Sequence, residues 1–522
     1  MIALGLDYGT TNSLITVYQR EMLSKSIKRV HKASSVVYSN GEYIRSPKRL
    51  LNNLQDNQLE VIMSCIDSCV NSLLGDLQCK VSKNELDNIR LALTVPNAFK
   101  DSQCDILKKS ILRSFSQHFS KFNSREVEII PEPVAAALYY AYCLKLSLGH
   151  ISGKQYIIVS DMGGGTTDLA VVKMEMKGQE LHFKVLTTEH DSFLGGDDID
   201  LLIAEHLTTK YNLSDVNKRY ILSAAQNLKK KLSINQARGI DSQADSLLLL
   251  DNNKYYCDGD KELEMTLDAV TLESLINMPT SRHHKGFLGT YTCLLERLRN
   301  NLIKHLNEDG FSNDDIESVL KKKVVLLPVG GSSRLRAVQD AFASSFRLSP
   351  VFHLKTEVGS DGSSEVYYDS VVRGAAIYSA FRSGIISDLC NKIVIENRTF
   401  HNISVRYSSD KVYTCVKKSM PDDIYTAVFN PKMISPDGKS FSIGTLEFYQ
   451  GGYENIMDKD CVRLATVTLD DTIFTNGKQR DEIKIILTLK ILNGRMHSGT
   501  VMVPNGNKDG SDYEKVIEIR KS

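Results

Sequence analysis

The segment that constrains this chain most is YIIVSDMGGGTTDLAVV, residues 156–172. Two apolar runs flank Asp161, three consecutive glycines, two threonines and Asp168. Short apolar runs on either side of a glycine-rich turn predict a β-hairpin. Glycines let backbone N–H groups approach an anion, and hydroxyls with carboxylates suit a phosphate and its Mg²⁺. The alternative for this segment alone is a flexible hairpin turn that binds nothing.

The N-terminal segment repeats this pattern. In LGLDYGTTNSLITVY, two apolar runs flank Asp7, Gly9, Thr10, Thr11 and Asn12. Internal repetition is an informative sequence signal. Two phosphate-binding hairpins far apart in the chain predict two similar half-domains that face each other across one nucleotide.

The composition is that of an ordinary globular chain with room for more than one domain. The 522 residues are 42% hydrophobic and carry a net charge of +1, which does not favour electrostatic binding to nucleic acid or to an anionic membrane. The first apolar run is too short for a signal peptide, and no run reaches the length of a membrane span. The 10 cysteines form no C-x-x-C pair, which favours reduced thiols in the cytosol. The adjacent His283 and His284 resemble metal ligands, but we interpret them as surface residues.

The pattern along the chain predicts two domains. Strands and helices alternate over residues 1–384, which is typical of an α/β nucleotide-binding domain. Residues 397–522 read as strands and turns, with an alternating run from Ile483 to Ile491 before a hairpin turn at 493–494, which predicts a β-sandwich. We expect residues 385–396 to form a linker. Its short apolar IVI serves as a linker, pairs with a sheet edge, or is the first sandwich strand.

Taken together, the motifs resemble the heat-shock protein 70 chaperones, also called DnaK-type, of the actin-like ATPase superfamily. The similar segments follow one another in the family's order: LGLDYGTTNS, TVPNAFKDSQ, IIPEPVAAALYY, SDMGGGTTD, FLGGDDID, LKKKLS and VGGSSRLRAVQ. The β-region segments KKSMPDDIYTAVF and LEFYQGGYENIMDKD are similar to the family's peptide-binding sandwich in pattern. The resemblance implies two duplicated α/β lobes around a nucleotide cleft, followed by an all-β sandwich.

The resemblance also implies that the cleft binds ATP or ADP with Mg²⁺. The loops at Gly9, Thr10, Thr11 and Asn12 and at Gly163, Gly164 and Gly165 would hold the phosphates, and Gly195 and Gly196 would lie beside them. Asp7 and Asp161 would hold Mg²⁺, mainly through water. Asp168 and Thr166 would stand near the attacking water, Lys48 near the γ-phosphate and Glu132 near the metal shell. The alternatives are turn-capping acids, a solvated lysine and a structural turn acid.

The adenosine end of the cleft is implied by three further segments. Lys229, Lys230 and Ser233 lie within one helical turn and would share a face toward the nucleoside. Gly330, Gly331, Ser332 and Arg334 would complete it, with the guanidinium stacked on the base. Asp369 would be a polar partner nearby. For the lysines, a solvated charge run is the alternative.

The sequence departs from the family pattern at several positions. Gln226 stands where a glutamate is usual, Lys230 where arginine is frequent and Cys104 where arginine is common. The linker reads IVIE in place of a leucine run followed by aspartate, whereas Pro96 is kept. The sequence ends at Ser522, directly after the β-region, so we expect a form without the family's helical lid and with fast peptide exchange. These departures leave interdomain coupling and recognition by a J-domain partner open.

We therefore expect a cytoplasmic, monomeric, ATP-dependent chaperone that acts in stress response and protein folding. Its expected partners are unfolded or extended polypeptides, a J-domain co-chaperone and a nucleotide exchange factor, with no nucleic acid and no membrane. The alternatives are a specialised DnaK-like regulatory ATPase without general folding activity, a sugar-type kinase on the same fold and an actin-like filament former.

Overall fold

The computed structural model describes residues 2–18, 31–34, 37–39, 42–44, 48, 51, 59–78, 89–97, 99, 101–119, 122, 127–151, 153–214, 216–237, 253–257, 261–348, 366–396, 402–406, 412–417, 420, 423–429, 445–451, 461–469, 484–492, 495–504 and 511–519. The chain divides into two compact units. The first comprises Met1–Leu50, Asn57–Pro96 and Ser110–Ile393, and the second Leu51–Asp56, Asn97–Lys109 and Val394–Ser522. The boundary at Ile393 falls inside the predicted linker. The domain limits 1–384 and 397–522 stay a prediction.

The first sheet of unit 1 has the order β3-β2-β1-β6-β7. Its strands are β1 (Ile2–Asp7), β2 (Asn12–Tyr18), β3 (His31–Ser34), β6 (Ile89–Val95) and β7 (Val127–Pro131). β1, β2 and β3 form an antiparallel meander, and β6 returns parallel to β1. β6 coincides with the apolar run IRLALTV, which ends directly before Pro96.

The second sheet has the order β13-β8-β9-β10-β14. Its strands are β8 (Lys154–Met162), β9 (Thr167–Lys177), β10 (Glu180–Asp191), β13 (Val324–Val329) and β14 (Lys392–Glu396). Strands β10, β9, β8 and β13 repeat the order of β3, β2, β1 and β6, whereas the fifth strand lies at the opposite edge. β8, β9 and β10 form an antiparallel meander, and β13 runs parallel to β8. The sequence repeat thus corresponds to a repeated sheet. β14 holds the apolar IVI of the predicted linker and lies at the edge of this sheet, while the linker itself stays a prediction.

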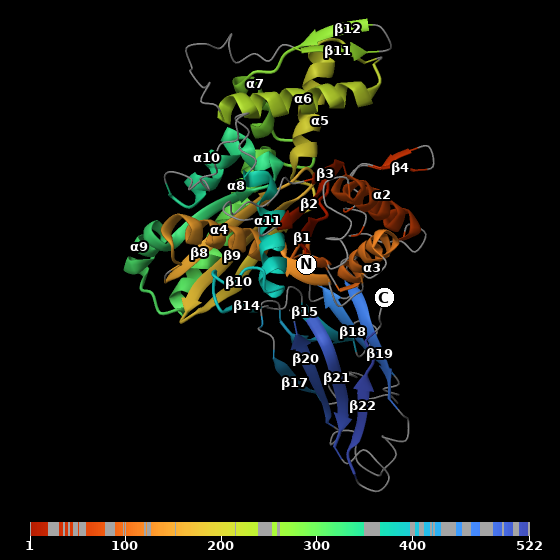
Figure 1. The fold of residues 1–522 in the computed structure, drawn as a ribbon, viewed down its shortest axis with the longest axis vertical. Helices are drawn as coiled ribbons and strands as arrows, with labels where there is room; N and C mark the ends of the chain where they lie inside the picture. The colour runs from red at the N-terminus through yellow and green to blue at the C-terminus, as the bar shows by residue number, and fades with distance from the viewer. Residues whose placement is uncertain are drawn as a thin grey trace, which may run out of the picture. The chain divides into compact units, whose positions relative to one another are not determined.

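Two helices, α4 (Glu132–Leu148) and α11 (Val366–Arg382), lie against each other in unit 1 (Figure 1). Their contact depends on small residues. A Cβ on Gly374 of α11 would lie 1.8 Å from the Ala135 carbonyl oxygen of α4. A Cβ on Gly5 of β1 would lie 2.3 Å from the Val372 carbonyl oxygen. These distances are too short for any side chain, so glycine is required where α11 crosses both elements.

The other elements of unit 1 cover the sheets or extend from them. They are β4 (Val37–Ser39), β5 (Glu42–Ile44), α2 (Leu59–Gln78), α5 (Gly196–Lys210), α6 (Lys218–Ala237), β11 (Asn253–Cys257), β12 (Lys261–Met265), α7 (Ala269–Asn277), α8 (Gly286–Glu308), α9 (Asn313–Lys323), the 3₁₀ turn η5 (Gly331–Arg334) and α10 (Arg336–Ser345). Helix α3 (Asp101–His118) belongs to unit 2 up to Lys109 and to unit 1 from Ser110. Apolar side chains from β8, β9, β13 and helices α5 to α10 form one core.

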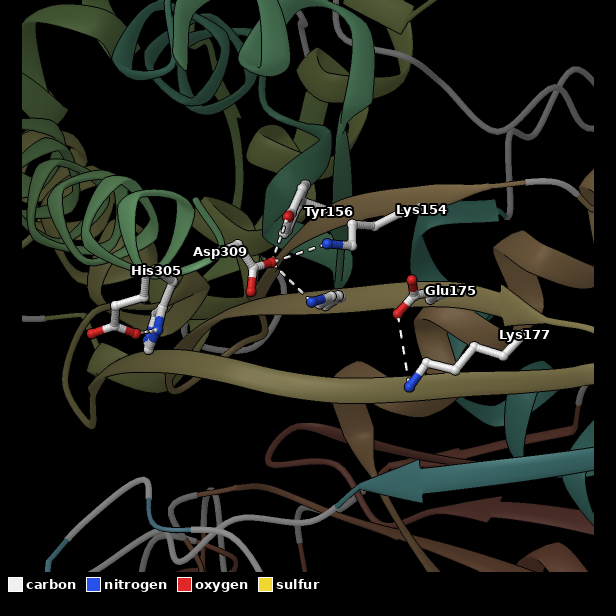
Figure 2. Close-up of polar contacts among 8 residues, drawn as sticks. Lys154, Tyr156, Glu175, Lys177, His305 and Asp309 are labelled. Atoms are coloured by element: carbon white, nitrogen blue, oxygen red, sulfur yellow. Dashed lines mark hydrogen bonds and ion pairs between the residues drawn. The ribbon is translucent and has the colours of Figure 1, made fainter. Parts of the chain in front are cut away.

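Asp309 attaches the end of α8 to the second sheet (Figure 2). Its Oδ2 accepts hydrogen bonds from Lys173 Nζ at 2.8 Å, Tyr156 Oη at 3.0 Å and Lys154 Nζ at 3.1 Å. Burial raises the pKa of Asp309, but these three donors outweigh it and lower the pKa to about 2. Figure 2 also shows Lys177 beside Glu175, and it shows His305, which pairs with Glu308.

Unit 2 contains two antiparallel sheets, β16-β15-β18-β19 and β17-β20-β21-β22. Their strands are β15 (Asn402–Arg406), β16 (Val412–Val416), β17 (Ile424–Phe429), β18 (Thr445–Gly451), β19 (Val462–Thr468), β20 (Ile485–Leu492), β21 (Arg495–Val503) and β22 (Tyr513–Ile517). Side chains of both sheets share one core, including Val405, Phe448, Leu487 and Val501. Ile485, Leu487, Leu489 and Ile491 of the predicted alternating run form the buried face of β20, and Ile483 lies outside the described residues. The turn predicted at 493–494 lies outside the described residues.

One interpretation of single residues is wrong. His283 is buried, with 6% exposure, and its ring packs edge-on against Phe287, because the turn before α8 folds back into the core; His284 is exposed as predicted. The described part of the chain contains no group of three or more His, Cys, Asp or Glu side chains placed to hold a metal ion directly. The cysteines in this part form no disulfide with one another. None of the helices described combines the length and apolar character needed to cross a bilayer.

Candidate functional site

A cavity of about 750 Å³ lies in unit 1 and is lined by both glycine-rich hairpins. Cavities of this size suit a ligand with the dimensions of a nucleotide. Every predicted site residue lines it except Gly165 and Gly195. The lining residues among those predicted are Asp7, Gly9, Thr10, Thr11, Asn12, Lys48, Glu132, Asp161, Gly163, Gly164, Thr166, Asp168, Gly196, Lys229, Lys230, Ser233, Gly330, Gly331, Ser332, Arg334 and Asp369.

The two hairpins meet at glycines. A Cβ on Gly164 would lie 1.8 Å from Thr11 Oγ1 on the other hairpin, and one on Gly9 would lie 2.1 Å from the Asn12 carbonyl oxygen. Only glycine permits these approaches. Thr11 Oγ1 is buried with no hydrogen-bond partner among the described residues. A buried hydroxyl of this kind at a cavity wall fits a polar ligand.

The second loop is held from behind by the start of α5. The Gly196 amide donates to the Gly163 carbonyl oxygen at 3.0 Å, and the Asp197 amide donates to that of Gly164 at 2.6 Å. The Gly195 amide donates to Asp198 Oδ2 at 2.9 Å. The amides of Gly196 and Asp197 therefore hold the loop, whereas the amide of Gly195 caps the start of α5.

Four carboxylates converge on the cavity from four elements: Asp7 from β1, Glu132 from α4, Asp161 from β8 and Asp168 from β9. Burial raises the pKa of Asp7 against the opposing effects of Lys48 and Thr94. Burial, followed by the charges of the neighbouring carboxylates, raises the pKa of Asp161 well above its ordinary value. Such crowding of like charges is typical of functional sites. A divalent cation at the cluster would relieve it.

Lys48 is the predicted cation of this cluster. Its Nζ lies 2.8 Å from Glu132 Oε1, and both side chains are at least nine-tenths buried. Burial lowers the pKa of Lys48, but the carboxylates of Glu132 and Asp7 outweigh it and raise the pKa. Burial raises the pKa of Glu132 to about 7 despite Lys48, with Asp7 and Asp168 adding to the rise. The alternative of a solvated lysine does not describe the buried Lys48, whereas the alternative of a structural turn acid for Glu132 stays open.

Asp168 has a partner that the sequence analysis missed, His190 on β10. His190 Nδ1 lies 2.7 Å from Asp168 Oδ1, and Thr166 Oγ1 donates to Asp168 Oδ2 at 3.3 Å. Burial raises the pKa of Asp168, but the charges of His190 and Lys48 outweigh it, so that the pKa lies below its ordinary value. No motif around residue 190 indicated this contact, which arises from the register of β9 and β10.

The ammonium group of Lys229 is bonded to other residues of the cavity wall. Its Nζ lies 2.7 Å from Asp200 Oδ1 and 2.6 Å from the Gly196 carbonyl oxygen, so it connects α6 to α5 at the cavity wall. Burial, together with the charge of Lys229, lowers the pKa of Lys230. Ser233 Oγ is buried, lines the cavity and has no hydrogen-bond partner among the residues described. The predicted shared face of Lys229, Lys230 and Ser233 does face the cavity.

The segment after β13 closes the remaining wall. Gly330 has a φ of 81°, and a Cβ there would lie 2.5 Å from both Asp161 Oδ1 and the Met162 carbonyl oxygen. Ser332 Oγ donates to the Gly163 carbonyl oxygen at 2.8 Å, which joins η5 to the second hairpin. Arg334 follows in η5 and lines the cavity. Asp369 lies in α11, where it is 2% exposed and forms an ion pair with Arg373 at 2.6 Å.

Other polar side chains line the cavity without having been predicted as site residues. They are Asp197, Asp200, Arg219, Ser223 and Gln226. Asp197 and Asp200 belong to the motif FLGGDDID, whose spacing of acids could have indicated them. Arg219, Ser223 and Gln226 precede Lys230 on the same helix, at spacings that return to one helix face. This helical spacing could have indicated that the three side chains line the cavity together with Lys230.

Comparisons with known proteins agree with this geometry. The model of the family described as "Hsp70 protein" matches residues 72–420. The "Chaperone protein DnaK" of Mycoplasmopsis synoviae (strain 53) is 26% identical over an alignment of 416 residues. The alignment covers 74% of this chain. The match spans 60% of that relative's own length.

Proposed function

The chain belongs to the Hsp70 family, and from this premise we propose that its cavity binds ATP and ADP with Mg²⁺ and that the chain slowly hydrolyses ATP. Membership also confirms the predicted fold class, actin-like α/β ATPase lobes with a β-sandwich. The observation that carries the proposal is the convergence of both glycine hairpins and four carboxylates on one cavity.

The phosphate end of the cavity fits a nucleotide and its cation. Backbone amides of the Gly9–Thr11 and Gly163–Thr166 loops would bind the phosphates, because glycine lets the chain approach them closely. Asp7 and Asp161 would hold Mg²⁺ mainly through water, in keeping with the preference of this ion for its own hydration shell. Bound Mg²⁺ would supply neutralisation of the phosphate charge.

The hydrolytic residues are proposed from position and charge. Asp168 and Thr166 would orient the attacking water, since their side chains are already hydrogen-bonded to each other at the cavity wall. Lys48 would face the γ-phosphate, and Glu132 would hold Lys48 in place through their 2.8 Å ion pair. Phosphoryl transfer requires mainly positioning and charge stabilisation, so a slow rate from oriented water is expected.

The adenosine end of the site is proposed to involve Lys230, Ser233 and Arg334, with Gly330, Gly331 and Ser332 forming the turn beneath the nucleoside. The buried Ser233 hydroxyl is suited to a hydrogen bond with the base. Lys229 would act indirectly, because its ammonium is bound to Asp200. Asp369 would act through its ion pair with Arg373.

We further propose that the β-sandwich of unit 2 binds extended polypeptide segments under the control of the nucleotide state. Such control is a linkage in which each ligand changes the affinity of the other by the same factor. A J-domain co-chaperone and an exchange factor are the proposed protein partners. The cysteines have no C-x-x-C spacing, which fits a reducing compartment, and we propose the cytoplasm. A monomer is the proposed state.

Calorimetry and single-turnover hydrolysis test the nucleotide site. We expect ATP and ADP to bind with Mg²⁺ and to bind at least tenfold more weakly in EDTA. Asp168→Asn and Lys48→Ala should slow hydrolysis by roughly 100-fold. The exposed Asp340→Asn and Lys177→Ala are the matched controls. Hydrolysis that is equal in all five proteins would refute the site assignment.

Fluorescence anisotropy of a labelled apolar peptide tests the second half of the proposal. We expect its affinity to differ between the ATP and ADP states. Hydrolysis without any peptide binding would instead support the alternative of a specialised regulatory ATPase.

A further inference from the structure

His190 occupies a position behind the cavity from which it reaches Asp168. The two residues are directly opposite each other in the antiparallel pair of β10 and β9. The ring bridges two side chains: Nδ1 lies 2.7 Å from Asp168 Oδ1, and Nε2 lies 2.7 Å from Ser192 Oγ. The His190 side chain is 30% exposed and does not line the cavity. A chain of hydrogen bonds thus connects Thr166 at the cavity with the surface.

Charges around His190 favour its protonated form. Asp168 faces it from β9, Asp191 follows it on β10, and Glu132 acts on it from α4. Glu189 precedes it but is paired with Arg297 of α8 at 3.0 Å. Burial lowers the pKa of His190, but Asp168 and the other acids outweigh it and raise the pKa above its ordinary value.

The contact fixes both oxygens of Asp168. Oδ1 accepts a hydrogen bond from the protonated imidazole Nδ1, and Oδ2 accepts one from the Thr166 hydroxyl. The order Asp168, His190, Ser192 is also that of a serine-hydrolase triad. Ser192, however, is not among the cavity-lining residues, so no substrate in the cavity would meet its hydroxyl. The arrangement therefore serves the carboxylate at the cavity end of the chain.

We propose that His190 is a positioning residue for ATP hydrolysis: as an imidazolium it keeps Asp168 ionised and turned so that Oδ2 stays with Thr166 at the cavity wall. This role rests on the proposed function. It predicts that hydrolysis slows as pH rises through the titration of His190, because a neutral imidazole holds Asp168 Oδ1 less strongly than the charged imidazolium does. Nucleotide affinity should stay unchanged, because His190 does not line the cavity.

The test is single-turnover hydrolysis between pH 6 and 9, with nucleotide affinity measured on the same samples. His190→Asn keeps a donor near Nδ1 without the charge, and His190→Ala removes both. His305→Asn is the control, because His305 is also paired with a carboxylate but lies away from the cavity. We expect hydrolysis at pH 6.5 to fall roughly tenfold in His190→Ala and by less in His190→Asn. Both variants should lose the decline at high pH and bind nucleotide within twofold of wild type.

The outcomes separate the two proposals. Retained nucleotide binding shows that the variants are folded. Hydrolysis by both His190 variants at the rate and with the pH profile of wild type and His305→Asn would overturn the role of His190 alone. Absence of hydrolysis in the wild type at every pH would overturn the proposed function and this role with it.

Discussion

The ionised carboxylate of Glu132 should lower the free energy of unfolding of the nucleotide-free protein, and Glu132→Gln should raise it. The carboxyl is buried beside Asp7 and Asp168, and its pKa rises from its ordinary 4.5 to about 7. The folded state therefore binds more protons than the unfolded state between these values, so stability falls as pH rises through this window. A shift of this size corresponds to about 3 kcal/mol once the pH exceeds 7.

Glutamine has the shape of the protonated acid and cannot ionise. We therefore expect Glu132→Gln and wild type to have the same unfolding free energy at pH 4. At pH 8 the variant should be more stable by about 3 kcal/mol, since it avoids the cost of ionisation. This pattern is the trade-off expected where a site holds charges for a ligand rather than for the fold.

Urea unfolding of the 522-residue chain in EDTA measures this difference in unfolding free energy. The transition of unit 1 is followed at pH 4, 6 and 8. Glu308→Gln is the control, because Glu308 is 71% exposed. Adding Mg²⁺ and ADP should stabilise wild type more than the variant. A Glu132→Gln protein that is less stable than wild type at pH 8, or that keeps the wild-type pH dependence, would refute the reasoning.

Three further predictions concern the walls of the cavity and the attachment of Asp309 to the second sheet. Gly164→Ala should weaken ATP binding at least tenfold in calorimetry, because its Cβ would lie 1.8 Å from Thr11 Oγ1 of the facing hairpin. Gly75→Ala is the control, because Gly75 in α2 has open space around it. Equal ATP affinities of the two variants would contradict the hairpin contact. Lys229→Met should destabilise unit 1 by about 3 kcal/mol in urea unfolding, since it leaves Asp200 buried without its cation; a loss below about 1 kcal/mol would contradict this. Asp309→Asn should cost about 1 kcal/mol at pH 7, discounted for its partial exposure. Because the pKa of Asp309 is lowered to about 2, this difference should disappear as pH falls from 4 to 2; a difference that persists at pH 2 would argue against the ion pairs.

The hairpins and the sandwich strands were open to prediction because their signals are local. In the β8–β9 loop, neighbouring glycines, threonines and aspartates specify the turn and its polar atoms within a few residues. In β20, the alternation of Ile485, Leu487, Leu489 and Ile491 places one face in the core regardless of what packs on it. The repetition of the first hairpin in the second predicted the duplicated sheet in the same way.

The sequence by itself thus determined the two hairpins, the duplicated sheets and the segments that line the cavity. Only the tertiary structure decided how their charges are paired. Lys229 is bound to Asp200, His190 is opposite Asp168, and His283 is buried. Each of these depends on the register of a strand pair or on the packing of one element against another. Such contacts join residues whose neighbours in sequence carry no trace of the partner, so only the folded chain reveals them.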